Sequence, residues 1–410
     1  MKIERTKNAT RNIIAGLGLK VYSIIVPFIM RTIMLYVLGA EYLGLDGLFA
    51  SILQVLNLTE LGVGMAMVNS MYKPIAEDDV DKICALMNLY KLYYRCIGCV
   101  ILTIGFSLMF FLSDLISGDI PHDINIYVLY IMNLGATVLS YWLFAYKNSL
   151  LLAHQRNDVS SKITMGTYTI RYLLQIGAII IFKSYYIYLM INLVAQILQN
   201  IVCAYVANKM YPKYKAYGKL TKDEIKNLNG KIRDVFTSKL GGVVVNSADT
   251  IVISTFLGLS LLAVYQNYYY ILSAVTGFVS IAFSSCTAGI GNSIIIETEE
   301  KNFNDLNKFT FIISWIAGVC SACFLCLFQP FMELWVGKDL MLGFSAVICF
   351  CIYFYVCEIN ALLNLYKDAA GIWHTDRFRP LITALANLIM NLIMVKFWGI
   401  YGVILSTVLS

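Results

Sequence analysis

Long apolar stretches alternate with short polar ones along almost the whole chain. A transmembrane helix needs about 20 apolar residues, whereas a transmembrane barrel strand needs only about ten. The fold class predicted is therefore an all-α polytopic membrane protein with about twelve transmembrane helices, the last of them unfinished at Ser410. The predicted helices lie at residues 12–38, 43–70, 86–112, 125–149, 161–182, 185–207, 235–257, 261–291, 308–329, 341–365, 380–396 and from 399 onward.

Composition agrees with this pattern. Hydrophobic residues make up 59% of the chain and charged residues only 14%, whereas soluble domains are about half apolar and about one quarter charged. The net charge of +6 could suggest nucleic-acid binding. However, the Lys and Arg residues lie between the apolar stretches and not on one face of a domain, so we expect no nucleic-acid partner.

The positive charges also predict an orientation. They gather in alternate connections, as expected for cytoplasmic loops, and the opposite connections hold only Lys183, Lys338 and Lys396. This places the N-terminus in the cytoplasm. The most polar stretch divides the chain into residues 1–208, an N-terminal bundle of about six helices, 209–233, a basic cytoplasmic linker, and 234–410, a C-terminal bundle whose last helix is incomplete. That incomplete end leaves open whether further C-terminal helices follow.

The two predicted bundles are related in sequence. A shift of 219 residues places Leu38-Gly39 on Leu257-Gly258 and Lys20 on Lys239. Since both halves contain the same number of predicted spans, this is a parallel repeat. Repeats of this kind place a substrate pathway at the interface between the halves.

Several short motifs carry a resemblance to a known family. The segment Asn246-Ser-Ala-Asp249-Thr-Ile-Val-Ile-Ser and the later Lys367-Asp-Ala-Ala-Gly371-Ile-Trp, with Asn387-Leu after it, resemble Wzx-type polysaccharide flippases. These belong to the MATE-like (multidrug/oligosaccharidyl-lipid/polysaccharide) transporter superfamily. The resemblance implies two six-helix bundles that form a V-shaped central cavity, and transport by alternating access.

A few cations lie within the apolar stretches, where a charge costs about 2.5 to 3.5 kcal/mol on insertion scales. Arg31, Arg171, Lys20 and Lys239 are the candidate substrate-binding residues, because guanidinium and ammonium groups suit a diphosphate. The alternative for Lys20 and Lys239 is that they extend toward the cytoplasmic headgroups.

Three embedded carboxylates have two interpretations. Asp249, Glu60 and Glu358 could couple transport to H+ or Na+, the only ions expected here, or they could serve in structural pairing. For Asp249 the repeat offset suggests a structural partner, because it places this residue opposite Met30 and beside Arg31. We expect no other cofactor and no metal site.

The predicted function is translocation of a polyprenyl-diphosphate-linked oligosaccharide from the cytoplasmic to the outer leaflet of the bacterial cytoplasmic (inner) membrane. Such a step serves lipopolysaccharide, capsule or exopolysaccharide biosynthesis, with glycosyltransferases and a polymerase as pathway partners. The alternative is a cation-coupled multidrug extruder of the same fold. We predict no enzyme and no catalytic residues, because there is no glycine-rich phosphate loop and no large extracytoplasmic loop that could hold a polymerase or ligase site.

Overall fold

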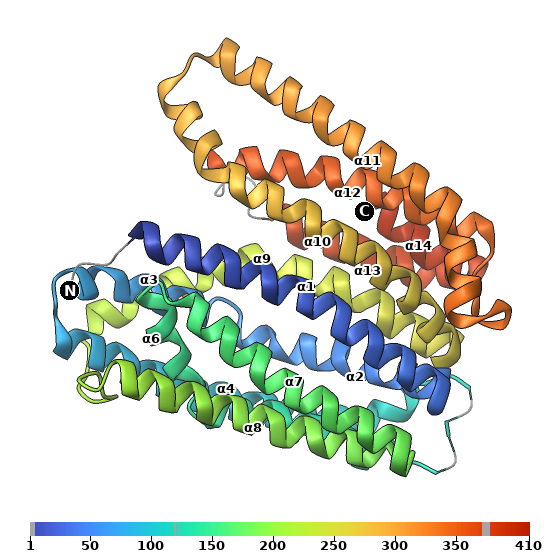
Figure 1. Ribbon diagram of the computed structural model, residues 1–410, viewed down its shortest axis with the longest axis horizontal. Coiled ribbons are helices and arrows are strands. Elements are labelled where there is room, and N and C mark those ends of the chain that lie inside the picture. The colour runs from blue at the N-terminus through green and yellow to red at the C-terminus, as the bar shows by residue number, and fades with distance from the viewer. Residues whose placement is uncertain (1–4, 119, 122, 371–377) are drawn as a thin grey trace. The chain divides into compact units, whose positions relative to one another are not determined.

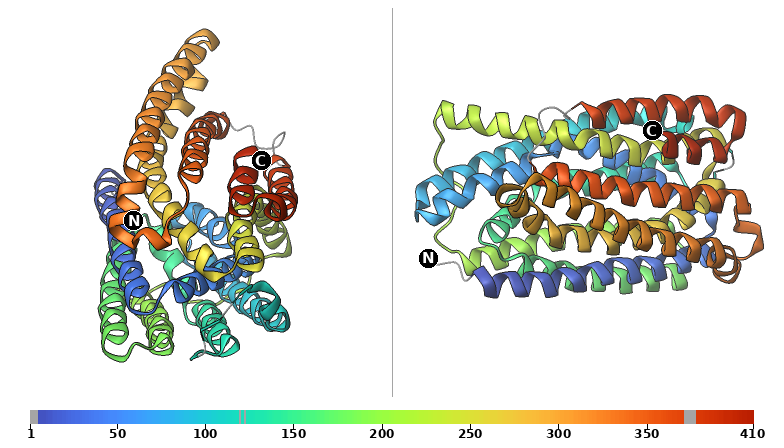
Figure 2. Two further views of the ribbon diagram at one scale, coloured as in Figure 1. Left: turned by 90° about the vertical axis from the view of Figure 1, so that its right-hand side faces the viewer. Right: turned by 90° about the horizontal axis from the view of Figure 1, so that it is seen from above.

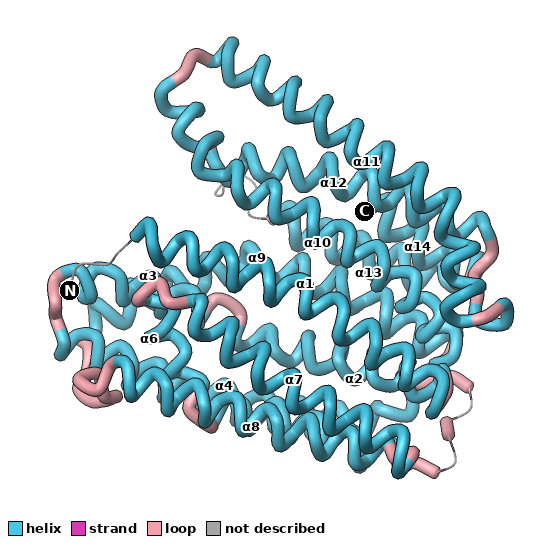
Figure 3. Tube along the Cα trace, viewed as in Figure 1, coloured by secondary structure: helices cyan, strands magenta, loops and turns pink. Residues whose placement is uncertain are grey.

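All regular structure in the computed structural model is helical over the residues it describes, which are 5–118, 120–121, 123–370 and 378–410 (Figures 1 and 3). The end of the motif that begins at Lys367 lies outside these ranges. The chain forms two compact units. The first ends at Val243 within α9, and the second consists of Val244–Ser410 together with a short segment that begins at Ile116. The predicted domain limits at 208 and 233 remain a prediction.

The first unit contains eight helices and the beginning of a ninth. Within it α1 packs on α7, α7 on α8, and α4 on α5, and Figure 1 shows α7 and α8 running side by side. The helices are α1 (Arg5–Val37), α2 (Ala40–Leu56), α3 (Val63–Ala76), α4 (Val80–Leu108), α5 (Ile126–Trp142), α6 (Asn148–Ala153), α7 (Asn157–Phe182), α8 (Tyr185–Met210) and α9 (Lys222–Leu257).

The second unit is built around α12, which contacts α10, α11 and α14. Figure 2 shows the helices of this unit in yellow to red. Buried Phe283, Ile313 and Leu362 form an apolar core between α10, α11 and α12. The unit consists of the end of α9 with α10 (Leu259–Ile296), α11 (Glu299–Val336), α12 (Phe344–Ala369), α13 (Arg379–Trp398) and α14 (Ile400–Leu409).

The number of membrane spans differs from the prediction. In the described part of the chain, nine segments are long and apolar enough to cross a membrane, and α5 with α6 adds a tenth as a pair bent by 48°. The predicted spans at 261–291 and from 399 onward, which correspond to α10 and α14, fall outside this count. The prediction of twelve spans is therefore not confirmed. In α14 the reason is length, since its 10 residues extend only about 15 Å.

Two predicted spans are interrupted by tight turns. The stretch 43–70 contains the 3-10 turn Asn57–Glu60 and then Gly62, which has φ 90°. A Cβ at Gly62 would lie 2.9 Å from the carbonyl oxygen of Ile232, so glycine is required there. The stretch 125–149 is broken at Phe144, which has φ 60°. Average hydropathy does not detect such breaks, because they change the backbone and leave the apolar character intact.

The internal repeat is visible in the backbone. Gly39 precedes α2 with φ 113° and ψ 173°, and Gly258 precedes α10 with φ 91° and ψ 169°. Each glycine lets the chain turn directly from one long helix into the next. A Cβ at Gly258 would lie 2.9 Å from the carbonyl oxygen of Ser117, which adds a second constraint there.

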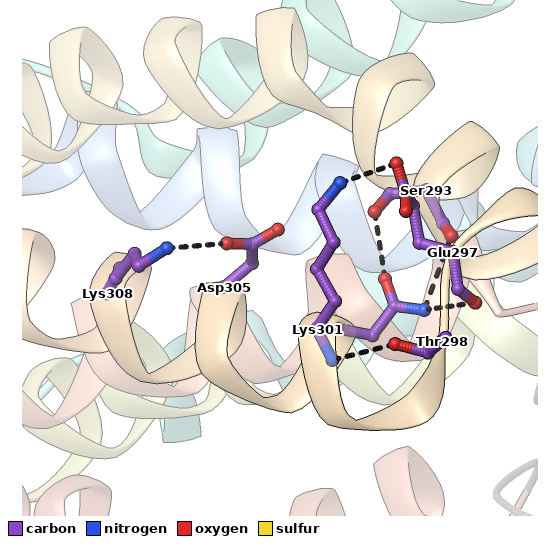
Figure 4. Close-up of polar contacts among 7 residues, drawn as sticks. Ser293, Glu297, Thr298, Lys301, Asp305 and Lys308 are labelled. Carbon is purple, nitrogen blue, oxygen red and sulfur yellow. Dashed lines mark hydrogen bonds and ion pairs between the residues drawn. The ribbon is translucent and has the colours of Figure 1, made fainter.

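The turn between α10 and α11 is fixed by polar contacts (Figure 4). Thr298 caps α11 by accepting a hydrogen bond from the Lys301 amide at 3.3 Å, and Lys301 forms an ion pair with Glu297 at 2.5 Å. Ser293 Oγ donates to Asn302 Oδ1 at 2.9 Å, which joins the end of one helix to the start of the next. The bond to Thr298 satisfies a backbone amide that the start of a helix leaves open.

The predicted linker is attached to the first unit. Asn88 Nδ2 of α4 donates to the carbonyl oxygen of Gly218 at 2.9 Å, and Tyr217 Oη donates to Asp81 at 3.0 Å. Lys82 pairs with Glu224 at 2.7 Å, two residues into α9. The basic segment therefore lies against the beginning of α4, and it is helical from Lys222 onward.

Candidate functional site

A half-buried carboxylate on α2, Asp46, lies within electrostatic range of the two candidate arginines. Asp46 interacts electrostatically with Arg31 of α1 and Arg171 of α7. Its Oδ1 also accepts a hydrogen bond at 3.0 Å from the buried Tyr185 Oη of α8. Tyr188 contributes a further ring, which interacts electrostatically with all three charges. Four helices of the first unit thus converge on an Arg–Asp–Arg arrangement.

The guanidinium of Arg171 is held on three sides. It lies 4.1 Å from the ring centre of Tyr168 and 4.3 Å from that of Tyr172, both on the same helix. Its Nη1 donates to Asn192 Oδ1 of α8 at 3.2 Å. Cation–π contacts and an amide oxygen replace part of the hydration that the cation loses in an apolar bundle. The group is held in place, yet it retains donors that can bind an anion.

The two candidate lysines are not part of this cluster. Lys20 precedes Arg31 by eleven residues on α1, a separation of about 16 Å along the axis. Lys239 is exposed and lies in the part of α9 that belongs to the first unit. Their roles as substrate ligands remain a prediction.

Glu60 is in a buried tyrosine network. Its Oε1 accepts a hydrogen bond from Tyr94 Oη at 2.9 Å, and Tyr94 Oη accepts one from Tyr90 Oη at 2.6 Å. Gly64 packs against this chain, since a Cβ there would lie 3.0 Å from Tyr90 Oη and 3.1 Å from Glu60 Oε1. Glu60 thus has a tyrosine donor and close packing around it, and the choice between structural pairing and coupling remains a prediction.

Glu358 of α12 is differently placed. Its side chain is 1% exposed, and its Oε1 has no hydrogen-bond partner among the described residues. This oxygen is a buried acceptor that a proton or a cation would satisfy. Glu358 therefore remains a candidate proton site.

The second unit contains a polar cluster around Asp249, which is 5% exposed. Its oxygens accept hydrogen bonds from Tyr265 Oη at 3.1 Å, Asn391 Nδ2 at 2.7 Å and Thr407 Oγ1 at 2.9 Å. Asn391 donates to Asn387 Oδ1 at 3.1 Å, so the cluster extends along α13. These partners are neutral and come from α10, α13 and α14.

The Asp249 cluster is rich in oxygen atoms. Three further oxygens belong to it: Asn387 Oδ1, Thr407 Oγ1 and the Val403 carbonyl oxygen. Asn387 Oδ1 accepts a hydrogen bond from Asn391 at 3.1 Å, and Thr407 Oγ1 lies 2.9 Å from Asp249 and 3.1 Å from the Val403 carbonyl oxygen. Asn391 Oδ1 accepts a short hydrogen bond from Ser406. The oxygen and nitrogen of an amide are nearly the same size, so rotation of the Asn391 amide would present its oxygen to Asp249. This group of oxygen atoms around Asp249 suits a hard monovalent cation or a proton.

Asp46, Asn391 and Thr407 were not found from the sequence. Asn387 and Asn391 are four residues apart in the apolar helix α13 and therefore share a face, which is a signal that the sequence contains. Asp46 lies only a few residues inside the predicted span 43–70, where a carboxylate resembles an ordinary interfacial residue. Its pairing with Tyr185, 139 residues away, becomes apparent only in the folded unit.

The sequence profile of the family described as "Polysaccharide biosynthesis protein" matches residues 9–288. The chain belongs to this family. The match covers the Arg–Asp–Arg arrangement and Asp249, whereas α13 and α14 follow it in the sequence. No curated protein matches the chain in sequence.

Solved transporter structures share the fold. An inward-facing multidrug resistance MATE family transporter of the MOP superfamily has a TM-score of 0.70 at 15% identity, over 96% of this chain and 93% of that one. The lipid II flippase MurJ, in an inward closed conformation, has a TM-score of 0.65 at 17% identity, over 97% and 84%. A MOP superfamily transporter from Pyrococcus furiosus has a TM-score of 0.61 at 14% identity, over 98% and 92%. The family member is thus a multi-pass membrane protein with a MATE-like fold.

Proposed function

We propose that this family member translocates a polyprenyl-diphosphate-linked oligosaccharide from the cytoplasmic to the outer leaflet of the bacterial cytoplasmic membrane. The observation that carries the proposal is the convergence of Arg31 and Arg171 on Asp46 within an apolar helical unit. Guanidinium groups match a diphosphate in charge and can each donate two hydrogen bonds to its oxygens. No bond is made or broken, and the polyprenyl tail stays in the lipid while the head group crosses.

Asp46 is the internal counter-ion in this proposal. Without substrate it offsets one of the two positive charges, which would otherwise both be uncompensated in a low-dielectric bundle. A diphosphate competes with Asp46 for the same cations. Release of the substrate restores the internal pairing, so the empty site carries less positive charge than two unpaired arginines would.

Coupling is assigned to the Asp249 cluster. Asp249, Asn387, Asn391, Thr407 and the Val403 carbonyl oxygen would hold H+ or Na+, and the bound ion would neutralise the carboxylate in its buried setting. Binding would reorganise the hydrogen bonds that join α9, α10, α13 and α14. A change of this kind in one bundle is what alternating access requires.

The test is complementation of bacteria that lack their own flippase for a surface polysaccharide. Expression of the chain should restore the polysaccharide, and Arg31→Ala and Arg171→Ala should each abolish it at unchanged protein abundance. The control is Lys183→Ala, because Lys183 is exposed and caps the end of α7 outside the arginine cluster. Normal polysaccharide in both arginine variants would contradict the proposal.

A second function has one observation in its favour. Asp46 and Asp249 both lie among tyrosines, and a carboxylate in an aromatic environment can bind a cationic drug. The same strains therefore serve a second assay. Raised tolerance to cationic dyes, with no restored polysaccharide, would identify the chain as a multidrug extruder.

A further inference from the structure

A groove runs between α7 and α8 of the first unit. Its volume is about 190 Å³, and its walls include Ile170 and Leu174 of α7 with Met190, Val194 and Leu198 of α8. Ile170 is 52% exposed, Leu174 57%, Met190 59% and Val194 58%. Because large apolar side chains of a membrane protein are exposed to lipid and not to water, the groove opens toward hydrocarbon.

Arg171 lies at the edge of this groove. Among the described residues that line it, Arg171 is the one that carries a charge. Around the helix axis, Arg171 has groove-lining residues on one side, Ile170 and Leu174. On its other side are the two tyrosines that stack on its guanidinium, Tyr168 and Tyr172. Its Nε is buried and has no hydrogen-bond partner among the described residues. The side chain therefore connects the apolar groove with the Arg–Asp–Arg arrangement.

The depth of Arg171 limits what can reach it. Arg171 is about 21 Å from the first residue of α7 and about 17 Å from the last, which places it near the middle of the bilayer. Phosphates of ordinary phospholipids lie outside a hydrocarbon core that is about 30 Å thick. A lipid phosphate reaches this depth only when its head group is crossing the membrane. A resident phospholipid could fill the groove with an acyl chain, but its phosphate would lie far from Arg171.

We propose that the α7–α8 groove binds the first isoprene units of the polyprenyl tail while Arg171 binds the diphosphate attached to them. This assignment rests on the proposed function and adds the place where the tail leaves the protein. An apolar groove open to lipid with one cation at its edge matches an amphiphile that is apolar along its chain and doubly charged at its end. It explains how a tethered head group can cross with its tail still in lipid.

The experiment measures binding to the purified full chain in phosphatidylcholine nanodiscs. The probes are geranylgeranyl diphosphate, geranylgeraniol and inorganic diphosphate, and the variants are Arg171→Gln, Val194→Trp and Ile201→Trp. Val194 lines the groove, whereas Ile201 is on the same helix, is 47% exposed and does not line it. The two tryptophan variants thus form a matched pair, and both replace a lipid-facing side chain, so folding should be retained.

Wild type should bind geranylgeranyl diphosphate about tenfold or more tightly than geranylgeraniol, and Arg171→Gln should remove most of that difference, since it deletes charge-assisted hydrogen bonds. Val194→Trp should weaken both isoprenoids and leave inorganic diphosphate unchanged. Ile201→Trp should bind all three probes as wild type does. If Val194→Trp unfolds, p-benzoylphenylalanine at position 194 replaces it, and its photo-crosslinks to geranylgeranyl diphosphate should exceed those from position 201.

Three results would overturn the assignment. The first is isoprenoid binding in Val194→Trp that is unchanged from wild type. The second is a loss of isoprenoid binding in Ile201→Trp equal to that in Val194→Trp. The third is displacement of geranylgeranyl diphosphate by phosphatidylglycerol as effectively as by further geranylgeranyl diphosphate. If one of these occurs while Arg171→Ala still abolishes surface polysaccharide, the groove is wrong and the proposed function stands. If wild type neither binds the diphosphate probe nor restores polysaccharide, both fail.

Discussion

Neutralising Asp46 should strengthen the binding of an anion to the first unit. In Asp46→Asn the side chain keeps its size, and Tyr185 Oη can still donate to the remaining oxygen, so the fold should be retained. A unit charge roughly 6 to 8 Å from the anion, at an effective dielectric constant of about 20, contributes about 2 kcal/mol of repulsion. Removing that charge also frees Arg31 and Arg171 from competition.

The expected result is a Kd for inorganic diphosphate about thirtyfold lower in Asp46→Asn than in wild type, measured by titration calorimetry on the purified protein at low salt. Transport should slow, because a site that binds its substrate more tightly releases it more slowly.

Two controls accompany this variant. Tyr185→Phe removes the hydroxyl donor to Asp46 and keeps the charge, so it should not reproduce the thirtyfold effect. Glu60→Gln neutralises a carboxylate held by the tyrosine network of the same unit and should leave the Kd unchanged. Weaker or unchanged diphosphate binding in Asp46→Asn would refute the idea that Asp46 is the counter-ion of the two arginines.

Further predictions concern coupling, packing and pH. Asp249→Asn should abolish the dependence of transport on an ion gradient at normal protein abundance; a mutant that still responds to the gradient would exclude Asp249 from coupling. Gly64→Ala should destabilise the first unit by about 1 to 3 kcal/mol, seen as a lower unfolding temperature, because the new methyl group crowds Tyr90 and Glu60; exposed Gly166→Ala, with open space around its Cβ, is the control. His154 is buried and stacks 4.1 Å from Tyr211, and burial lowers its pKa. The unfolded chain therefore binds this proton more readily, and stability should fall as pH drops below about 6.5, with His154→Gln showing a weaker pH dependence; identical profiles would contradict this.

Much of the fold could be predicted because hydrophobic length and charge asymmetry are local properties of a membrane protein. Each predicted span corresponds to a helix or a helix pair, and the repeat of Gly39 at Gly258 appears in their shared backbone conformation. The breaks at Gly62 and Phe144 could not be predicted, because they depend on neighbours such as Ile232 and on backbone angles.

The candidate site was predicted only in part. Arg31 and Arg171 stood out because a charge in an apolar stretch is rare. Their common partner Asp46 did not, since partners far apart in sequence meet only after the helices pack. In the Asp249 cluster, the carboxylate was visible and its ligand-like neighbours Asn391 and Thr407 were not, because neutral polar residues are common in membrane helices.

The most direct test of lipid-linked glycan transport is a flipping assay in proteoliposomes. Purified protein is reconstituted with a polyprenyl-diphosphate oligosaccharide, and an external glycosidase reports how much of the glycan becomes accessible with time. Wild type should expose glycan from the inner leaflet, Arg31→Ala and Arg171→Ala should expose no more than protein-free liposomes, and Lys183→Ala should behave as wild type. Equal exposure by wild type and both arginine variants would contradict the role of the two arginines, and no exposure by folded wild type under any ion gradient would contradict glycan transport itself.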